Sequence, residues 1–82
     1  MTMDSLALVE AILDLEYDFR ISTPRGEARS YQRLGELHAE LCRARRDLSP
    51  DEVWQRLANH LRSVGAPRDR LRPETTFEAL LG

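Results

Sequence analysis

The sequence predicts an all-α protein folded as a small bundle of three to four helices. Three observations carry this prediction. Apolar residues recur at helical spacing in residues 4–19, 30–46 and 49–64, a strong helix-start motif stands at residues 49–52, and a glycine followed by a proline ends the last of these segments. The 82 residues allow one domain, residues 1–82. A chain of this length buries only about 60% of its unfolded surface, so we expect a modest core.

The first predicted helix covers residues 4–19. Asp4 or Ser5 can cap it, because either side-chain oxygen can accept a hydrogen bond from a free N–H of the first turn. Its apolar residues at helical spacing are expected to face the core, and these are Leu6, Val9, Ile12, Leu13 and Phe19, with Leu8 and Leu15 widening the face. Three acids four residues apart are expected to share one exposed stripe, and these are Glu10, Asp14 and Asp18.

A loop is predicted over residues 20–29, with one short helical turn at residues 25–29, because Pro24 disfavours a helical conformation at the preceding residue. The second helix is predicted over residues 30–46, with Ser30 as its N-cap. Its buried face is formed by Tyr31, Leu34, Leu37 and Leu41, with Cys42 beside them. Gly35 costs this helix about 1 kcal/mol against alanine, which indicates that another part of the backbone approaches it closely.

The third helix, residues 49–64, has the clearest start in the chain. Ser49 at the N-cap, Pro50 at the first helical position and Glu52 two residues later form a capping box. Its buried stripe is Val53, Trp54, Leu57, Leu61 and Val64. Gly65 and Pro67 fit its end. The short linker after the second helix predicts an antiparallel hairpin. Residues 66–82 form a long connection whose final turn, capped by Thr75 or Thr76, carries Phe77, Leu80 and Leu81.

The charge of the chain is unevenly spread. Residues 1–19 hold five acidic and no basic residues, whereas the remainder holds all 12 arginines and nine acids. The first helix should therefore attract a basic surface. The arginines are mixed with acids and no aromatic residues interleave with them, so we expect no binding of nucleic acid.

Composition also bounds the location and the chemistry. No apolar run approaches the roughly 20 residues of a membrane helix. The N-terminus is acidic where a signal peptide would be basic, so we expect a cytoplasmic protein that does not bind membranes. Cys42 is the only cysteine, which excludes an internal disulfide. His38 and His60 have no second ligand four residues away, so we expect no metal site. No catalytic set stands at recognisable spacing, so we expect no enzyme.

Several stretches resemble the acyl carrier and peptidyl carrier proteins. The run Asp4-Ser5-Leu6, followed by Val9-Glu10, Leu15-Glu16 and Phe19, is similar to the family's signature around the serine that receives 4′-phosphopantetheine. Residues 49–64 resemble the family's first helix, residues 65–82 its long first loop and residues 30–41 its last helix. The halves stand in exchanged order, because residues 1–46 resemble the second half of the family's fold and residues 49–82 the first. The chain therefore resembles a circularly permuted carrier protein.

This resemblance implies a function and a set of sites. Ser5 would hold 4′-phosphopantetheine covalently, with Asp4 and Leu6 completing the motif that a phosphopantetheinyl transferase reads. The resemblance also implies docking of acyl- or aminoacyl-activating and acyl-transferring enzymes on the acids of the first helix, which are Glu10, Asp14, Glu16 and Asp18. We expect a monomer rather than a domain-swapped dimer.

The sequence leaves other interpretations open beside the carrier. Ser5 can be an ordinary capping residue, and the acids can be a solvated helix face. A carrier fold that serves as an interaction adaptor without modification is the alternative function.

Overall fold

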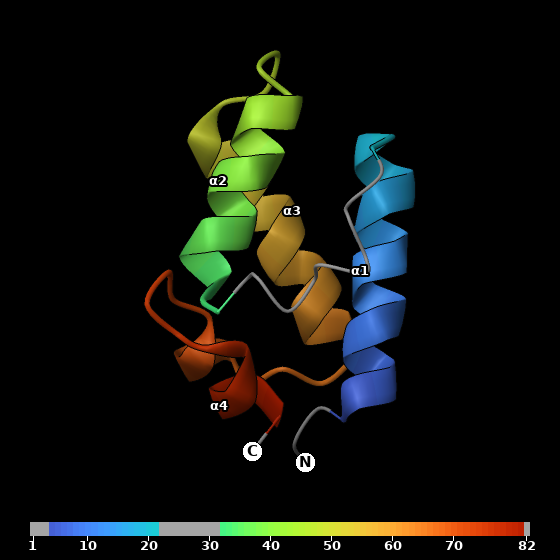
Figure 1. Ribbon diagram of the computed structural model, residues 1–82, viewed down its shortest axis with the longest axis vertical. Helices are drawn as coiled ribbons and strands as arrows, with labels where there is room; N and C mark the ends of the chain where they lie inside the picture. Colours follow the sequence, from blue (N-terminus) through green and yellow to red (C-terminus); the bar gives the residue numbers. More distant parts are fainter. Residues whose placement is uncertain (1–3, 22–31, 82) are drawn as a thin grey trace.

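The computed structural model of the chain is an all-α bundle (Figure 1) and describes residues 4–21 and 32–81. Its helices are α1 (Ser5–Phe19), α2 (Leu34–Ala44), α3 (Pro50–Ser63), the 3-10 turn η2 (Arg68–Arg70) and α4 (Phe77–Leu81). The predicted small helical bundle is thus confirmed. α3 packs against both α1 and α2, and α4 lies across one end of the bundle (Figure 1). Within the described ranges, no helix has the length and apolar content needed to cross a membrane.

The start and the end of α3 follow the sequence closely. The Ser49 hydroxyl accepts a hydrogen bond from the Glu52 backbone N–H at 3.2 Å, and Pro50 occupies the first helical position. At the other end Gly65 has φ +105°, a conformation that side chains with a Cβ rarely adopt. Ala66 N–H then donates to Leu61 O at 3.0 Å, which closes the helix with a glycine-dependent turn.

The predicted start of α2 is wrong, because the residues directly before Leu34 are extended. Arg33 has φ −125° and ψ 154° and pairs with Thr76 in an antiparallel bridge. Leu34 N–H donates to Thr75 O at 2.9 Å, so the loop before α4 satisfies donors that a capping side chain would otherwise take. The expected cap Ser30, its neighbour Tyr31 and the predicted turn at residues 25–29 lie outside the described residues. At its far end α2 stops at Ala44 and does not continue to residue 46.

The predicted core face of α1 is also wrong in part. Leu6, Val9 and Leu13 are 67%, 51% and 40% exposed, whereas Ala11 and Leu15 are buried. Phe19 is buried as expected. The reason is that α1 carries apolar residues around most of its circumference, so spacing alone permits more than one core face. The buried face consists of Ala11, Leu15 and Phe19, which stand four residues apart.

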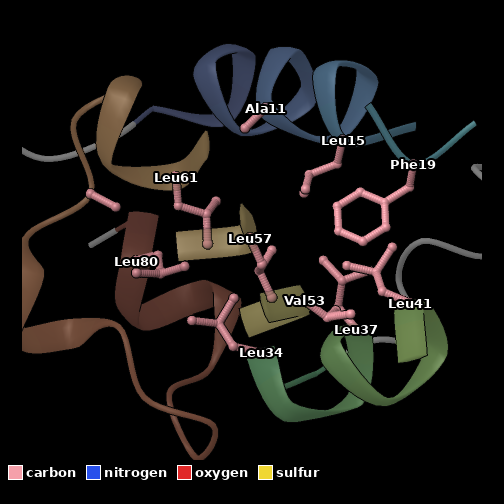
Figure 2. Packing of buried hydrophobic residues seen from close by; sticks show 11 residues of the cluster. Ala11, Leu15, Phe19, Leu34, Leu37, Leu41, Val53, Leu57, Leu61 and Leu80 are labelled. Atoms are coloured by element: carbon pink, nitrogen blue, oxygen red, sulfur yellow. The ribbon is translucent and has the colours of Figure 1, made fainter. Parts of the chain in front are cut away.

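The core lies where α1, α2, α3 and α4 converge (Figure 2). α2 and α3 each contribute three fully packed aliphatic side chains at helical spacing, and these are Leu34, Leu37, Leu41, Val53, Leu57 and Leu61. Leu80 of α4 is fully buried on the same side of this core as Leu34 and Leu61 (Figure 2). The segment after α3 is therefore fastened to the bundle by an apolar anchor as well as by the bridge at Thr76.

Gly35 stands where this segment crosses α2. Its N–H donates to Pro73 O at 2.8 Å, and a Cβ at this position would lie 3.0 Å from the same oxygen and 3.2 Å from Pro73 Cβ. The close backbone approach predicted from the sequence is thus confirmed. A hydrogen-bonded carbonyl cannot retreat from a methyl group without lengthening its bond.

We therefore expect Gly35→Ala to destabilise the protein, although alanine favours a helix. Overpacking costs about 1–3 kcal/mol, which should exceed the gain of roughly 1 kcal/mol in helix propensity. Urea denaturation measures the result. The control Ala39→Gly, at an exposed site of the same helix, reports the propensity alone and should lose about 1 kcal/mol. A Gly35→Ala variant that is more stable than the parent would show that the loop is free to move away.

Candidate functional site

The expected attachment motif forms the first turn of α1. Asp4 is the N-cap of this helix, and its Oδ1 accepts a hydrogen bond from the Ala7 N–H at 2.7 Å. Of the two candidate caps, Asp4 therefore fills the position. Ser5 is the first helical residue, and its side chain lies outside what the structure describes. Leu6 is 67% exposed. The motif thus lies at a helix N-terminus, where backbone N–H groups and the helix dipole favour a phosphate group.

α4 lies at the same end of the bundle as this first turn (Figure 1). Thr76 caps α4, since its hydroxyl oxygen accepts a hydrogen bond from the Ala79 N–H at 3.1 Å. Arg70 Nη1 donates to the Ala79 carbonyl at 2.6 Å, and Leu80 is buried in the core. These contacts fix the short helix against the bundle although only five residues form it.

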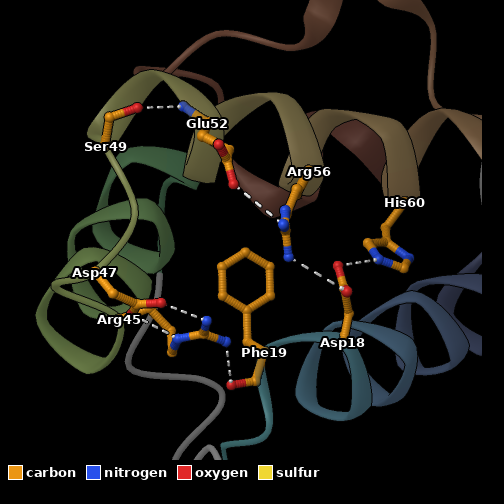
Figure 3. A network of polar contacts seen from close by, with 8 residues as sticks. All are labelled: Asp18, Phe19, Arg45, Asp47, Ser49, Glu52, Arg56 and His60. Carbon is orange, nitrogen blue, oxygen red and sulfur yellow. Dashed lines mark hydrogen bonds and ion pairs between the residues drawn. The ribbon is translucent and has the colours of Figure 1, made fainter.

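The four acids expected to dock partners have different environments. Glu10 and Asp14 are exposed on α1. Glu16 is only 6% exposed, so its side chain is not accessible to a partner surface as those of Glu10 and Asp14 are. The exposure expected of Asp18 is wrong, because its carboxylate lies between α1 and α3. Its Oδ2 is 3.1 Å from His60 Nε2 and its Oδ1 is 3.6 Å from Arg56 Nη1 (Figure 3).

Asp18 belongs to a group of contacts that hold the C-terminal end of α1, which we call the α1 clamp: Asp18, Phe19, Arg45, Arg56 and His60. The guanidinium of Arg56 lies over the Phe19 ring, 5.9 Å from its centroid (Figure 3). Arg45 Nη1 donates to the Phe19 carbonyl at 3.1 Å. A cation at this position also complements the negative end of the α1 dipole. The clamp therefore ties α1 to both other long helices.

The clamp was not predicted from the sequence. Arg45 directly follows α2, but its guanidinium reaches the end of α1. Its contact with Phe19 joins residues 26 apart, and that of His60 with Asp18 joins residues 42 apart. Contacts between residues so far apart along the chain leave no periodic pattern in the sequence. Tertiary packing alone brings these residues together.

The Arg45–Asp47 pair stabilises the turn that leads from α2 to α3. Arg45 Nε and Nη2 donate to the two carboxylate oxygens of Asp47 at 2.9 and 2.7 Å (Figure 3). These hydrogen bonds lower the pKa of Asp47 to about 2, and the carboxylate raises the pKa of Arg45. The pair keeps Arg45 oriented toward the end of α1.

The two histidines and the cysteine have structural contacts. His38 Nε2 lies 2.9 Å from Pro50 O and 3.5 Å from Cys42 Sγ, and the His38 ring meets Trp54 edge to face at 5.3 Å between centroids. These contacts join α2 to α3. Among the residues that the structure describes, no group of three or more histidine, cysteine or acidic side chains could hold a metal ion.

We expect Asp18→Asn and Asp14→Asn to differ in their effect on stability. Asp18→Asn weakens the ion pair with Arg56 and the hydrogen bond with His60 at a site about a third exposed, and it should cost about 0.5–1 kcal/mol. Asp14→Asn changes an exposed acid and should stay within roughly 0.5 kcal/mol of the parent. Urea midpoints measure both. Equal midpoints for the two variants would contradict the assignment of Asp18 to the clamp.

The effect of Asp47→Asn should depend on pH. The pKa of Asp47 is lowered to about 2 in the folded chain, from an ordinary value of 3.8. The stabilisation by its carboxylate is therefore present above about 3.8 and is lost as the pH falls through about 2. Urea midpoints of parent and variant should differ at pH 6 and converge near pH 2. A difference that stays constant over this range would contradict the role of the Arg45–Asp47 pair.

The chain has no significant match among family models, curated proteins or solved structures. Its function is therefore argued from its own residues. These residues offer a serine motif at the start of α1, a segment of η2 and α4 at the same end of the bundle, and exposed acids further along α1.

Proposed function

We propose that the chain is a carrier protein similar to acyl and peptidyl carrier proteins, in circularly permuted order. Ser5 would hold 4′-phosphopantetheine through a phosphodiester bond, and the terminal thiol of that group would carry an acyl or aminoacyl cargo as a thioester. α1 would present this cargo to partner enzymes. The chain itself would perform no catalysis.

The observation that carries the proposal is the location of Ser5. It is the first residue of α1 and directly follows the capping residue Asp4. The early N–H groups of a helix lack partners inside the helix. A phosphate attached at this position would therefore meet free donors and the positive end of the dipole.

The arrangement of the segments also supports the exchanged order. α4 lies at the end of the bundle where α1 begins (Figure 1). A chain that continued from α4 into α1 would therefore not have to cross the molecule. A short turn that contains Asp47 and Leu48 joins α2 to α3 at the opposite end. Such proximity of segment ends is what makes circular permutation compatible with a fold.

Loading would be carried out by a phosphopantetheinyl transferase with coenzyme A as donor. In this step the Ser5 hydroxyl oxygen would form a bond to the phosphorus next to pantetheine, the pyrophosphate bond would break, and the nucleotide half would leave. The Asp4 carboxylate is exposed and fixed by its capping bond. It can therefore contribute to recognition by the transferase at a defined position beside Ser5.

A second candidate function is an interaction adaptor that is never modified. It is favoured by the apolar residues exposed along α1, since a helix can bind partners through such a face whether or not a prosthetic group is attached. This candidate predicts partner binding that is unchanged by Ser5→Ala.

Loading of Ser5 can be tested by mass spectrometry. We expect the parent chain, incubated with a promiscuous phosphopantetheinyl transferase and coenzyme A, to gain the mass of one phosphopantetheine group, and Ser5→Ala to gain none. Ser63→Ala, at an exposed serine of α3, is the matched control and should load like the parent. No gain in the parent, or equal gain in Ser5→Ala, would refute the carrier function.

A further inference from the structure

His38 and Cys42 place two metal-ligating atoms side by side on α2. Cys42 Sγ lies 3.5 Å from His38 Nε2, and the two residues stand four apart, which brings them to the same face of the helix. The expectation that His38 has no second ligand four residues away is therefore wrong, because Cys42 occupies that position. We call these two side chains the α2 pair.

The distance within the α2 pair matches the geometry of a tetrahedral metal ion. Zinc binds histidine nitrogen at about 2.0–2.1 Å and cysteine sulfur at about 2.3 Å, and at a tetrahedral angle of about 109° these bonds hold the two ligand atoms about 3.5–3.6 Å apart. The observed separation is 3.5 Å. A zinc ion can therefore contact both atoms while the backbone of α2 stays in place.

Neighbouring groups of α3 orient the His38 ring. Trp54 meets it edge to face at 5.3 Å between ring centroids, and Pro50 O lies 2.9 Å from the same Nε2 atom. Nε2 binds a metal in the tautomer that carries its proton on Nδ1, so the metal replaces the hydrogen bond to Pro50. This exchange leaves no unpaired carbonyl, because in an α-helix the oxygen of residue 50 also accepts a hydrogen bond from the N–H of residue 54.

The α2 pair is accessible but incomplete as a metal site. Both side chains are half-buried, so an ion can reach them from solvent. In residues 4–21 and 32–81, no third histidine, cysteine or acidic side chain joins them to form a larger ligand group. The remaining positions around a tetrahedral ion are therefore left to water or to a small ligand from solution. The site is open, unlike the closed four-ligand sites that stabilise small zinc domains.

The pair of His60 and Asp18 suits a metal ion less well. His60 Nε2 lies 3.1 Å from Asp18 Oδ2, but Arg56 Nη1 lies 3.6 Å from the second oxygen of the same carboxylate. The guanidinium offsets the charge of the carboxylate and repels an entering cation. The α2 pair instead combines a thiol with an imidazole, which are ligand types that zinc prefers.

We propose that the α2 pair binds Zn²⁺, with the Cys42 thiolate and His38 Nε2 as ligands and solvent at the open positions. Binding releases the proton of the thiol, and no electron is transferred. Two protein ligands bind less tightly than four, so we expect an apparent dissociation constant on the order of micromolar at neutral pH. A bound ion would also shield the only cysteine of the chain from oxidation. This site is independent of Ser5 and lies beyond the proposed carrier function.

Titration of the full, reduced chain with Co²⁺ tests the site. Cobalt can replace zinc in tetrahedral sites, and a thiolate ligand gives it an intense charge-transfer band in the near ultraviolet. We expect this band in the parent chain and its loss on addition of Zn²⁺. Cys42→Ala should abolish the band. His38→Gln should weaken cobalt binding by at least about tenfold, because even the loss of a group that only orients a ligand costs this much. His60→Gln is the matched control and should bind cobalt like the parent.

Stability gives a second readout, because a metal that binds only the folded chain raises the urea midpoint. Zn²⁺ should raise the midpoint of the parent and of His60→Gln, and leave that of Cys42→Ala unchanged. Each variant is first checked for a native circular dichroism spectrum, and Cys42→Ser replaces Cys42→Ala if the latter is not native.

Three outcomes would overturn the zinc site. These are the absence of a charge-transfer band in the parent, equal cobalt affinity in His38→Gln, and a band that appears only at two chains per cobalt, which would place the metal between copies. Ser5→Ala should bind cobalt like the parent, so that failure of loading at Ser5 and failure of the metal site are separate results.

Discussion

The rest of the structure depends on how Phe19 is held. Its ring is buried under the Arg56 guanidinium, and its carbonyl accepts a hydrogen bond from Arg45. These contacts fix the rotation of α1 about its own axis. Because α1 is apolar around most of its circumference, its hydrophobic pattern alone does not determine that rotation. The clamp at one end of the helix therefore decides which apolar residues enter the core and which remain outside.

The features that depend mainly on neighbouring residues could be predicted from the sequence. The start of α3 at Ser49 and its end at Gly65 depend on neighbouring residues, and both were predicted correctly. The close approach at Gly35 was also predicted, because a glycine destabilises the interior of a helix and is expected there where another segment packs closely against it. The fold class followed from the helical periods. In most of these cases the determining interaction lies within a few residues; at Gly35 the contact with Pro73 is distant, and the clue was the cost of a glycine inside a helix.

The sequence was not sufficient where distant segments compete for the same residues. The segment before α2 reads as helical, but Arg33 pairs with Thr76 across the molecule and stays extended. Asp18 reads as one of a row of solvated acids, but His60 and Arg56 face it from α3. The candidate site is affected in the same way. Its first turn was predicted from the motif, whereas the separation of its acids into structural and exposed ones required the packing of α1 against α3.

The loop before α4 and the first turn of α2 depend on each other for their ordered conformations. α2 has no capping side chain, and carbonyls of Pro73 and Thr75 accept the N–H groups of Gly35 and Leu34. In return, Phe77 N–H donates to the carbonyl of Gln32. The first turn of α2 and the loop about 40 residues later therefore form together, so that closing a long loop and starting a helix are one cooperative event. Opening of either segment releases the other, and their amide protons should exchange with solvent at a common rate.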